Sequence, residues 1–264
     1  MTIRPVFALA VLSLGGLSAC FDGSDPRYVE FDSLTSNRVD ALNAQSLNVR
    51  ARTTDQITGE LDRQADTFEL DAESGTIDVS RTTVTLNGGG TIDLTGTTEF
   101  ARFFDSQPSG GDTTTGVVGV PTIVGDVPGG GTATYSGVSE VAIQDGLALY
   151  DLDGTMEATA DFSAGTLDVT LDNLGGQRQD FILGTSNVTD VATITISDAM
   201  ISDNTVSGGT STLTSATING GGGFSGTQTT SHEAGFYGPR ADEVGGVLYI
   251  DDTSVQVFGQ YLGD

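Results

Sequence analysis

The sequence is poor in the residues that build most metal and nucleophilic sites. It contains one cysteine, Cys20, and one histidine, His232. A single thiol excludes a disulfide within the chain and a thiolate metal cluster. We find neither a zinc site built on histidines nor a Ser-His-Asp triad, and the chain has no nucleophile elbow and no phosphate-binding loop. We therefore expect a protein that is not an enzyme and that holds no metal.

Positive charge is also scarce. The chain has 10 basic residues against 36 acidic ones, and every basic residue is arginine. Binding to nucleic acid requires a basic stripe that neutralises phosphates, so a nucleic-acid partner is excluded. The formal net charge of −26 is typical of a solvated acidic surface that keeps the protein soluble. A surface that gathers cations or basic partners is the alternative.

The N-terminus has an apolar stretch that is too short to remain as a membrane span. Arg4 precedes this stretch and small residues follow it, which is the layout of a secretory signal peptide over residues 1–19. The segment Leu17-Ser18-Ala19-Cys20 resembles a bacterial lipobox, so we expect cleavage before Cys20 and lipid attachment (palmitate among the acyl chains) to its thiol. With Phe21 rather than Asp at the next position, the segment resembles lipoproteins that are sorted to the outer membrane, and this resemblance implies an outer-membrane protein that could be displayed on the cell surface. An ordinary secreted protein with a free thiol is the alternative.

The mature chain divides into two β-rich parts. Residues 20–27 form a polar tether, and alternating segments within residues 28–106 predict a small sheet, with one helix-like piece at 39–44. Residues 107–131 are rich in Gly, Pro, Thr and Asp and are interpreted as a linker, although Val117-Val118-Gly119-Val120 could be a strand. Residues 132–264 contain the most regular alternation of apolar and polar residues, joined by short turns with Gly, Asn or Asp.

The regular pattern in residues 132–264 predicts about eight or nine antiparallel strands without an intervening helix. An up-and-down series of this size favours a closed barrel, because closure removes exposed strand edges. A β-sandwich is the structural alternative. The predicted fold class is all-β, with a small amino-terminal subdomain followed by an eight-stranded antiparallel up-and-down β-barrel.

The carboxy-terminal segment carries a specific motif. Gly223-Phe224-Ser225-Gly226 is followed by a hairpin from Gly235 to Val247 and by Val257-Phe258-Gly259. In order and spacing these pieces resemble the barrel domain of the transferrin-binding protein B family, which also includes factor H binding protein and haem- or haemoglobin-capturing surface lipoproteins. The resemblance covers residues 132–264 and implies that residues 28–106 are a handle-like subdomain. Full transferrin-binding proteins have two lobes, whereas this chain has room for one handle and one barrel. The motif residues are Gly235, Phe236, Tyr237, Gly238, Ala241, Glu243, Gly245, Gly246, Phe258 and Gly259.

These motif residues are read as fold residues rather than ligand contacts. Glycines allow sharp turns and close backbone approach, Phe236 can plug the barrel interior, and the Glu243 carboxylate can accept hydrogen bonds from loop amides. Because a fold does not determine a function, the ligand-binding residues stay unknown.

Small-ligand chemistry has few candidates. His232 is interpreted as a strand-surface residue, with an axial haem ligand as the alternative, and Tyr237, Met156 and Met200 could assist with haem. Asp151-Leu152-Asp153-Gly154 and Asp251-Asp252 weakly resemble Ca²⁺ ligands but lack the rest of a calcium loop, so we read them as solvated turn acids.

The sequence and the resemblance together predict a non-catalytic binding protein anchored to the outer membrane. Its ligand would be a protein or a haem-like nutrient, passed to a TonB-dependent receptor, and a surface-lipoprotein export barrel is a further expected partner. The alternative is a structural or adhesive envelope lipoprotein with no small ligand.

Overall fold

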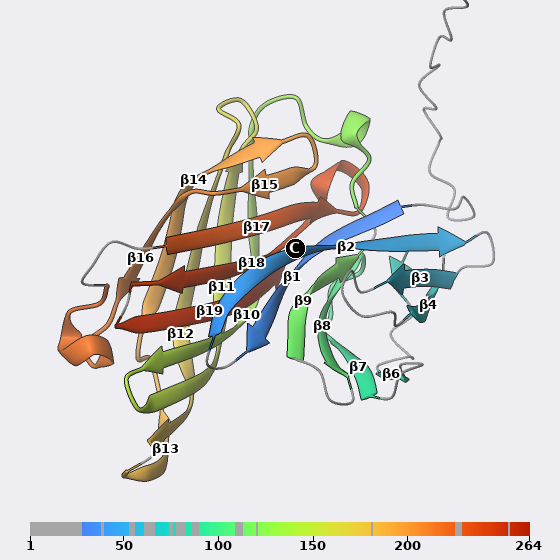
Figure 1. Ribbon diagram of the computed structural model, residues 1–264. Helices are drawn as coiled ribbons and strands as arrows, with labels where there is room; N and C mark the ends of the chain where they lie inside the picture. The colour runs from blue at the N-terminus through green and yellow to red at the C-terminus, as the bar shows by residue number, and fades with distance from the viewer. Residues whose placement is uncertain are drawn as a thin grey trace, which may run out of the picture.

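The chain folds into two β-sheets, a ten-stranded sheet and a nine-stranded sheet that lies beside it (Figure 1). The structure is a computed structural model that describes residues 28–37, 40–52, 56–60, 67–73, 76–77, 83–85, 90–108, 113–119, 121–180, 182–224, 229–252 and 254–264. Within these ranges it describes side chains from residue 93 onward, except at residues 106–108, 113–114 and 229. Within these ranges all regular structure is strand apart from three short 3-10 turns, and no helix there is long and apolar enough to span a membrane. Cys20, the leader and the tether lie outside the described residues.

The ten-stranded sheet is made by the second half of the chain. Its strands are β10 (Thr132–Asp145), β11 (Ala148–Asp161), β12 (Thr166–Asp180), β13 (Gly184–Val188), β14 (Thr193–Ser202), β15 (Thr205–Ser207), β16 (Thr210–Thr214), β17 (Thr229–Tyr237), β18 (Glu243–Asp251) and β19 (Val255–Gly263). Along β11 and β12 buried and accessible residues alternate, as expected for strands with one face in a core.

Eight of these strands close into a ring. Antiparallel pairing runs from β10 through β11, β12, β14, β15, β17, β18 and β19 and returns to β10. The predicted eight-stranded up-and-down barrel is therefore confirmed, and the sandwich is excluded. Two short strands extend one end of the ring, because β13 pairs only with β12 and β16 only with β14. A single cluster of buried aliphatic and aromatic side chains fills the barrel, including Ile143, Leu171 and Phe236.

The first half of the chain forms the nine-stranded sheet, here called the handle. Its strands are β1 (Tyr28–Asn37), β2 (Asp40–Arg52), β3 (Gln56–Glu60), β4 (Thr67–Glu73), β5 (Thr76–Ile77), β6 (Thr83–Thr85), β7 (Gly90–Thr95), β8 (Ala101–Pro108) and β9 (Thr113–Gly119). They lie in the order β5-β4-β3-β2-β1-β9-β8-β7-β6.

Two predictions for this half need correction. Residues 40–44 are the start of β2 and not a helix, because the antiparallel ladder with β1 supplies backbone partners that one isolated helical turn lacks. The linker interpretation of 107–131 is wrong for its first half, since β8 extends to Pro108 and β9 pairs with both β1 and β8. The handle thus extends to Gly119, and the expected strand near Val117 is the end of β9.

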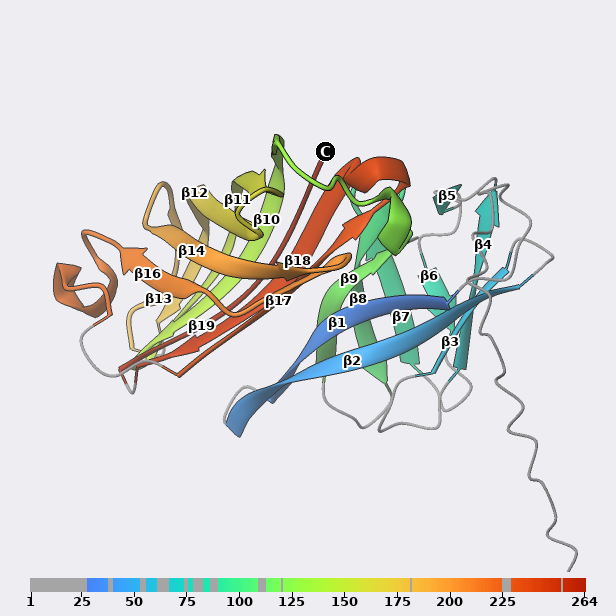
Figure 2. The same cartoon turned by 90° about the horizontal axis from the view of Figure 1, so that it is seen from above.

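The handle packs against the outer wall of the barrel (Figure 2). β1 lies against β17 and β18, β9 lies against β18 and β19, and β8 lies against β19. A small apolar cluster joins the two sheets and is here called the junction: Phe100, Ala101, Phe103, Val117, Tyr237 and Leu262. Tyr237 and Leu262 belong to barrel strands, but they point outward because their sequence neighbours fill the interior.

Candidate binding surface

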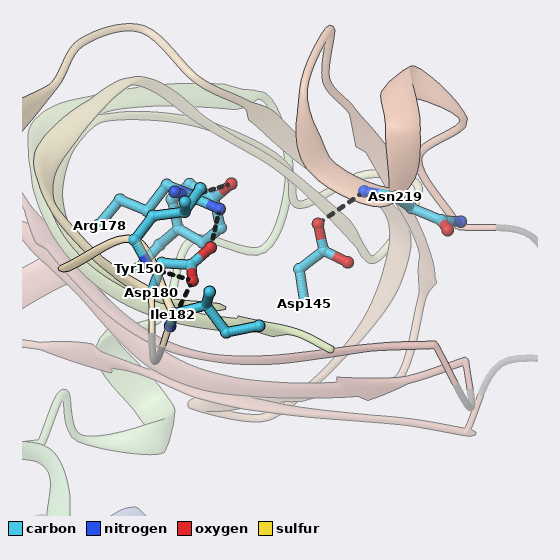
Figure 3. Close-up of polar contacts among 7 residues, drawn as sticks. Asp145, Tyr150, Arg178, Asp180, Ile182 and Asn219 are labelled. Atoms are coloured by element: carbon cyan, nitrogen blue, oxygen red, sulfur yellow. Dashed lines mark hydrogen bonds and ion pairs between the residues drawn. The ribbon is translucent and has the colours of Figure 1, made fainter. Parts of the chain in front are cut away.

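One end of the barrel carries a set of connected loops, here called the rim. The rim consists of the β10–β11 turn, the β12–β13 hairpin and the 3-10 turn η2 (Ile218–Gly221). Figure 3 shows the polar side chains that gather there: Asp145, Tyr150, Arg178, Asp180 and Asn219. The pairing of Asp145 with Ala148, and of Ala148 with Asp180, places the β10–β11 turn next to the β12–β13 hairpin.

Arg178 is held in place by two neighbours. It lies directly across from Tyr150 in the β11–β12 ladder, and its Nε donates a hydrogen bond to the Tyr150 hydroxyl at 3.2 Å. Its Nη2 contacts Asp180 Oδ2 at 2.6 Å, and its guanidinium lies 5.7 Å from the centre of the Tyr150 ring. A guanidinium that makes several such contacts keeps one orientation, so Arg178 presents a positioned positive charge at the rim.

Asp180 also shapes the β12–β13 hairpin. Its Oδ1 accepts the backbone N–H groups of Ile182 at 2.8 Å and Leu183 at 3.0 Å, which is an Asx-type turn. The hydrogen bonds from Leu183 and Ile182, and then Arg178, lower the pKa of Asp180 below its ordinary value. The carboxylate therefore stays charged at neutral pH and keeps the turn formed.

Three large apolar side chains are exposed on this rigid frame. Ile182 and Leu183 are each 78% exposed at the hairpin tip, and Leu147 in the adjacent turn is 60% exposed. Sequence reasoning did not single out these residues. The available signal was the apolar pair Ile182-Leu183 between Asp180 and Gly184, a place where turn residues are normally polar.

The η2 turn is the part of the rim that covers the end of the barrel core. The backbone N–H of Asn219 donates to Asp145 Oδ2, at the end of β10, at 2.9 Å. Ile218, the preceding residue, is fully buried in the barrel core. The rim therefore overlies a packed interior, and what it presents to solvent is loop surface.

The aromatic motif residues of the carboxy-terminal segment lie at three places. Phe236 lies inside the barrel, as expected, with its ring 5.4 Å from that of Phe162. Tyr237 lies in the junction, whereas Phe258 packs on Val247 and Tyr249 on the barrel's outer face. The remaining motif positions are Gly235 on β17, Gly245 and Gly246 on β18, Gly259 on β19, and Gly238 and Ala241 in the β17–β18 connection.

Two glycines of this motif leave room for the handle to pack against the barrel. Gly238 has a φ of +73°, and a side chain there would collide with the ring of Phe100. A Cβ at Gly245 would lie 2.8 Å from Val117 of β9, so this position must also stay small. The motif thus marks the handle-to-barrel contact and not the barrel corners alone.

Glu243 makes the polar link of this contact. Its Oε1 accepts the backbone N–H groups of Glu99 at 2.5 Å and Phe100 at 2.9 Å, both on the handle side. These are hydrogen bonds to loop amides of the kind that the sequence suggested. Because Glu243 is only 2% exposed, burial raises its pKa, while the amide hydrogen bonds and Arg102 oppose this shift.

His232 is buried, so its interpretation as a strand-surface residue is wrong. It is 3% exposed; Nε2 lies 2.7 Å from the Tyr261 hydroxyl and Nδ1 lies 2.9 Å from the carbonyl oxygen of Gly208. Burial lowers the pKa of His232 to about 4, so the ring is neutral at physiological pH. Its side chain faces inward because it shares the β17 face of Ala234 and Phe236. Both ring nitrogens already have partners.

The other candidates for small ligands are dispersed. Met156 is buried in the barrel core, Met200 is 59% exposed on β14, and Tyr237 lies in the junction.

The interpretation of the two acidic pairs as solvated turn acids is correct only in part. Asp151 and Asp153 are exposed, but they lie within strand β11 and not in a turn. Asp252 lies in the β18–β19 turn, where it is fully buried and accepts the N–H groups of Ser254 and Val255. Among the described residues, no group of His, Cys, Asp or Glu is spaced to hold a metal ion.

Comparisons with known proteins agree with this architecture. Residues 127–263 match the family model described as C-lobe and N-lobe beta barrels of Tf-binding protein B. The structure is similar to the Trp-176-Ala mutant of transferrin binding protein B from Haemophilus parasuis, with a TM-score of 0.60, 17% identity, 90% of this chain covered and 45% of that one. This chain therefore spans less than half the length of that relative. No curated protein matches the sequence.

Two further solved structures have weaker similarity. Transferrin binding protein B from Neisseria meningitidis gives a TM-score of 0.47 at 17% identity, covering 83% of this chain and 51% of that one. HpuA from Kingella denitrificans, solved in complex with human haemoglobin, gives a TM-score of 0.45 at 14% identity, covering 92% of this chain and 86% of that one. The family model matches more than half of the chain and coincides with the observed barrel, so the chain belongs to the transferrin-binding protein B family.

Proposed function

We propose that this protein is a non-catalytic surface lipoprotein that captures a protein ligand through the rim of its barrel. Membership of the transferrin-binding protein B family supports a ligand-binding role. The observation that carries the proposal is a group of exposed apolar side chains: Ile182 and Leu183 on a hairpin that Asp180 and Arg178 hold in one shape, and Leu147 in the adjacent β10–β11 turn.

A protein ligand suits this surface better than a small molecule. Exposed apolar side chains on a rigid frame act as anchors, because burying them on binding removes apolar area from water at little conformational cost. Haem capture inside the barrel has less support, since Ile218 and the core side chains fill the interior and both nitrogens of His232 are engaged. Related solved proteins are named for transferrin or haemoglobin, and the ligand of this chain belongs to the same class in our proposal: a protein that carries iron or haem.

Replacing Leu147, Ile182 and Leu183 together with aspartate should abolish ligand capture. Truncation of a central anchor typically costs at least ~2 kcal/mol of binding, so Kd should rise by at least ~30-fold. The mature protein, immobilised through its C-terminus, is incubated with growth medium containing host serum proteins, and retained protein and haem-band absorbance are measured.

Val138→Asp is the matched control for the rim variant. Val138 is also an exposed apolar residue, 50% exposed, but it lies mid-strand on the outer wall of β10 and away from the rim. Capture that survives the rim substitutions, or that is lost equally in the control, contradicts binding at the rim. Retention of a chromophore without protein would indicate haem as the ligand instead.

Membrane attachment through Cys20 is a separate part of the proposal. Cells fed radiolabelled palmitate should incorporate label into the wild-type protein, and the Cys20→Ala variant should carry no label and leave the outer-membrane fraction. Labelling that persists in Cys20→Ala would show that the anchor lies elsewhere. Protease added to intact cells tests display on the surface.

The acidic surface supports a second candidate, a structural or adhesive envelope protein. Deleting the gene distinguishes the two functions. Impaired growth on a protein-bound iron source supports capture, whereas altered attachment or envelope integrity with normal iron uptake supports the second candidate. A neighbouring gene for a TonB-dependent receptor or a surface-lipoprotein export barrel would support the capture function and would identify the partner protein.

A further inference from the structure

Two rows of acidic side chains face each other at one edge of the junction. On the handle, the strand register places Asp93 of β7 directly across from Asp105 of β8. On the barrel wall, it places Asp153 of β11 across from Glu140 of β10, and Gln260 of β19 on the other side of Glu140. Like charges directly opposite each other destabilise a sheet, so each row contains an unfavourable pair.

The register and the packing bring these rows together. Ala101 and Phe103 of β8 pack on the barrel, and Asp105 is the next residue on that face of the strand. Leu262 of β19 lies in the same apolar cluster, and Gln260 is the preceding outward residue. β8 and β19 are in contact, so the acidic rows continue the apolar junction toward its edge.

The electrostatics of this edge favour the uncharged carboxyl forms. Burial, and then the charges of Glu140, Asp93 and Asp151, raise the pKa of Asp105 to about 6. Burial also raises the pKa of Glu140; the hydrogen bond from Gln260 opposes this shift, and Asp153 and Asp151 add to it.

Among the described side chains, no basic group contacts Asp105 or Glu140. β9, β10 and β19 have no basic residue, and β8 has only Arg102, which points to the opposite face and donates to the carbonyl oxygen of Ala101. The charge that interacts with Arg102 is that of Glu243, which lies at the other end of the junction.

Gln260 provides an independent sign that a proton donor is missing. It is 3% exposed, and its Nε2 donates to Glu140 Oε2 at 2.6 Å, but its buried Oε1 has no hydrogen-bond partner. A buried acceptor without a donor is costly, and a protonated carboxyl group beside it would supply the donor. No group of acids there is spaced for a metal ion in the described part of the chain.

We propose that this edge is a pH-dependent contact, at which protonation of Asp105 and Glu140 closes the handle onto the barrel wall and their ionisation loosens it. The sign follows from linkage: a carboxyl with a raised pKa in the closed state takes up a proton on closure, so closure is favoured below that pKa and weakened above it. The handle would be held most tightly in acidic surroundings and would gain mobility near neutrality.

Hydrogen exchange of the full mature protein tests this proposal. After correction for intrinsic rates, exchange of peptides covering β8 and β19 should slow roughly tenfold between pH 7.5 and pH 5.0, because one proton with a pKa near 6 is taken up on closure. The Asp105→Asn, Glu140→Gln double variant should exchange slowly at both pH values, and each single variant should show a reduced pH dependence.

Glu157→Gln is the matched control, since Glu157 is an exposed acid on the outer face of β11 away from the handle. It should retain the full wild-type pH dependence. The neutral, buried His232 weakens the whole fold as pH falls below about 6.5, equally in all variants, so only differences between variants are compared. A pH-independent wild type, or a double variant that keeps the wild-type dependence, overturns the proposal.

Discussion

Replacing Glu243 with alanine should detach the handle from the barrel and lower the thermal stability of the protein markedly. The substitution leaves the backbone N–H groups of Glu99 and Phe100 without their acceptor and removes a side chain that is 2% exposed. Losing hydrogen bonds to a carboxylate in such a site costs about 2–4 kcal/mol in total. For a protein of this size the midpoint of unfolding should fall by roughly 5–15 °C in a calorimetric scan.

Two companion variants separate the hydrogen bonds from the general loss of an acid. Glu243→Gln keeps an acceptor oxygen for the two amides, so it should retain at least about half of the stability lost in the alanine variant. Glu157→Ala removes an exposed acid from the outer barrel wall and should change the midpoint little. Limited proteolysis should cut the handle first in Glu243→Ala. A barrel and handle that unfold together at the wild-type temperature would show that Glu243 does not join them.

Replacing Phe236 with alanine should destabilise the barrel itself by about 3–5 kcal/mol. Phe236 is fully buried, and its ring lies 6.2 Å from that of Tyr135 and 5.4 Å from that of Phe162. Removing the ring leaves a cavity among side chains that the closed ring of strands prevents from collapsing. Urea denaturation, followed by tyrosine fluorescence, measures the loss.

Phe236→Leu serves as the volume control for this variant. Leucine keeps much of the buried apolar volume, so the cost should be about 1–1.5 kcal/mol. Ligand capture measured below the unfolding transition should survive both substitutions, because Phe236 does not belong to the rim. Equal destabilisation by alanine and leucine would indicate that the aromatic contacts, and not the filled volume, determine the stability here.

The sequence alone predicted the all-β class and favoured a closed barrel over a sandwich. Strict alternation in segments such as Leu167-Asp168-Val169-Thr170-Leu171 determines which face of a strand is buried, and this information is local. The Gly-Phe-Tyr-Gly hairpin and the Glu243 carboxylate could be recognised for the same reason, since each residue type meets a local backbone or hydrogen-bonding need.

The handle was harder to predict, because its order depends on contacts between distant segments. Asp40 to Ala44 has the spacing of a helix, yet it pairs with β1. Thr113 to Gly119 has the composition of a linker, yet it lies between β1 and β8. Pairing with a strand far along the chain, or with one whose own pattern is weak, overrides local preference.

Only the tertiary structure revealed the surfaces on which the two proposals rest. Leu147 becomes a neighbour of Ile182 because β10–β11 and β12–β13 end at the same edge of the barrel, and Asp105 meets Glu140 because two separate sheets pack together. His232 follows an alternation that the sequence does contain, but its burial became evident only when β17 was placed in the closed ring beside Tyr261. The local alternation of apolar and polar residues determines where strands form. Which strands become neighbours depends on barrel closure and on packing between the sheets, and no single segment of the sequence determines these.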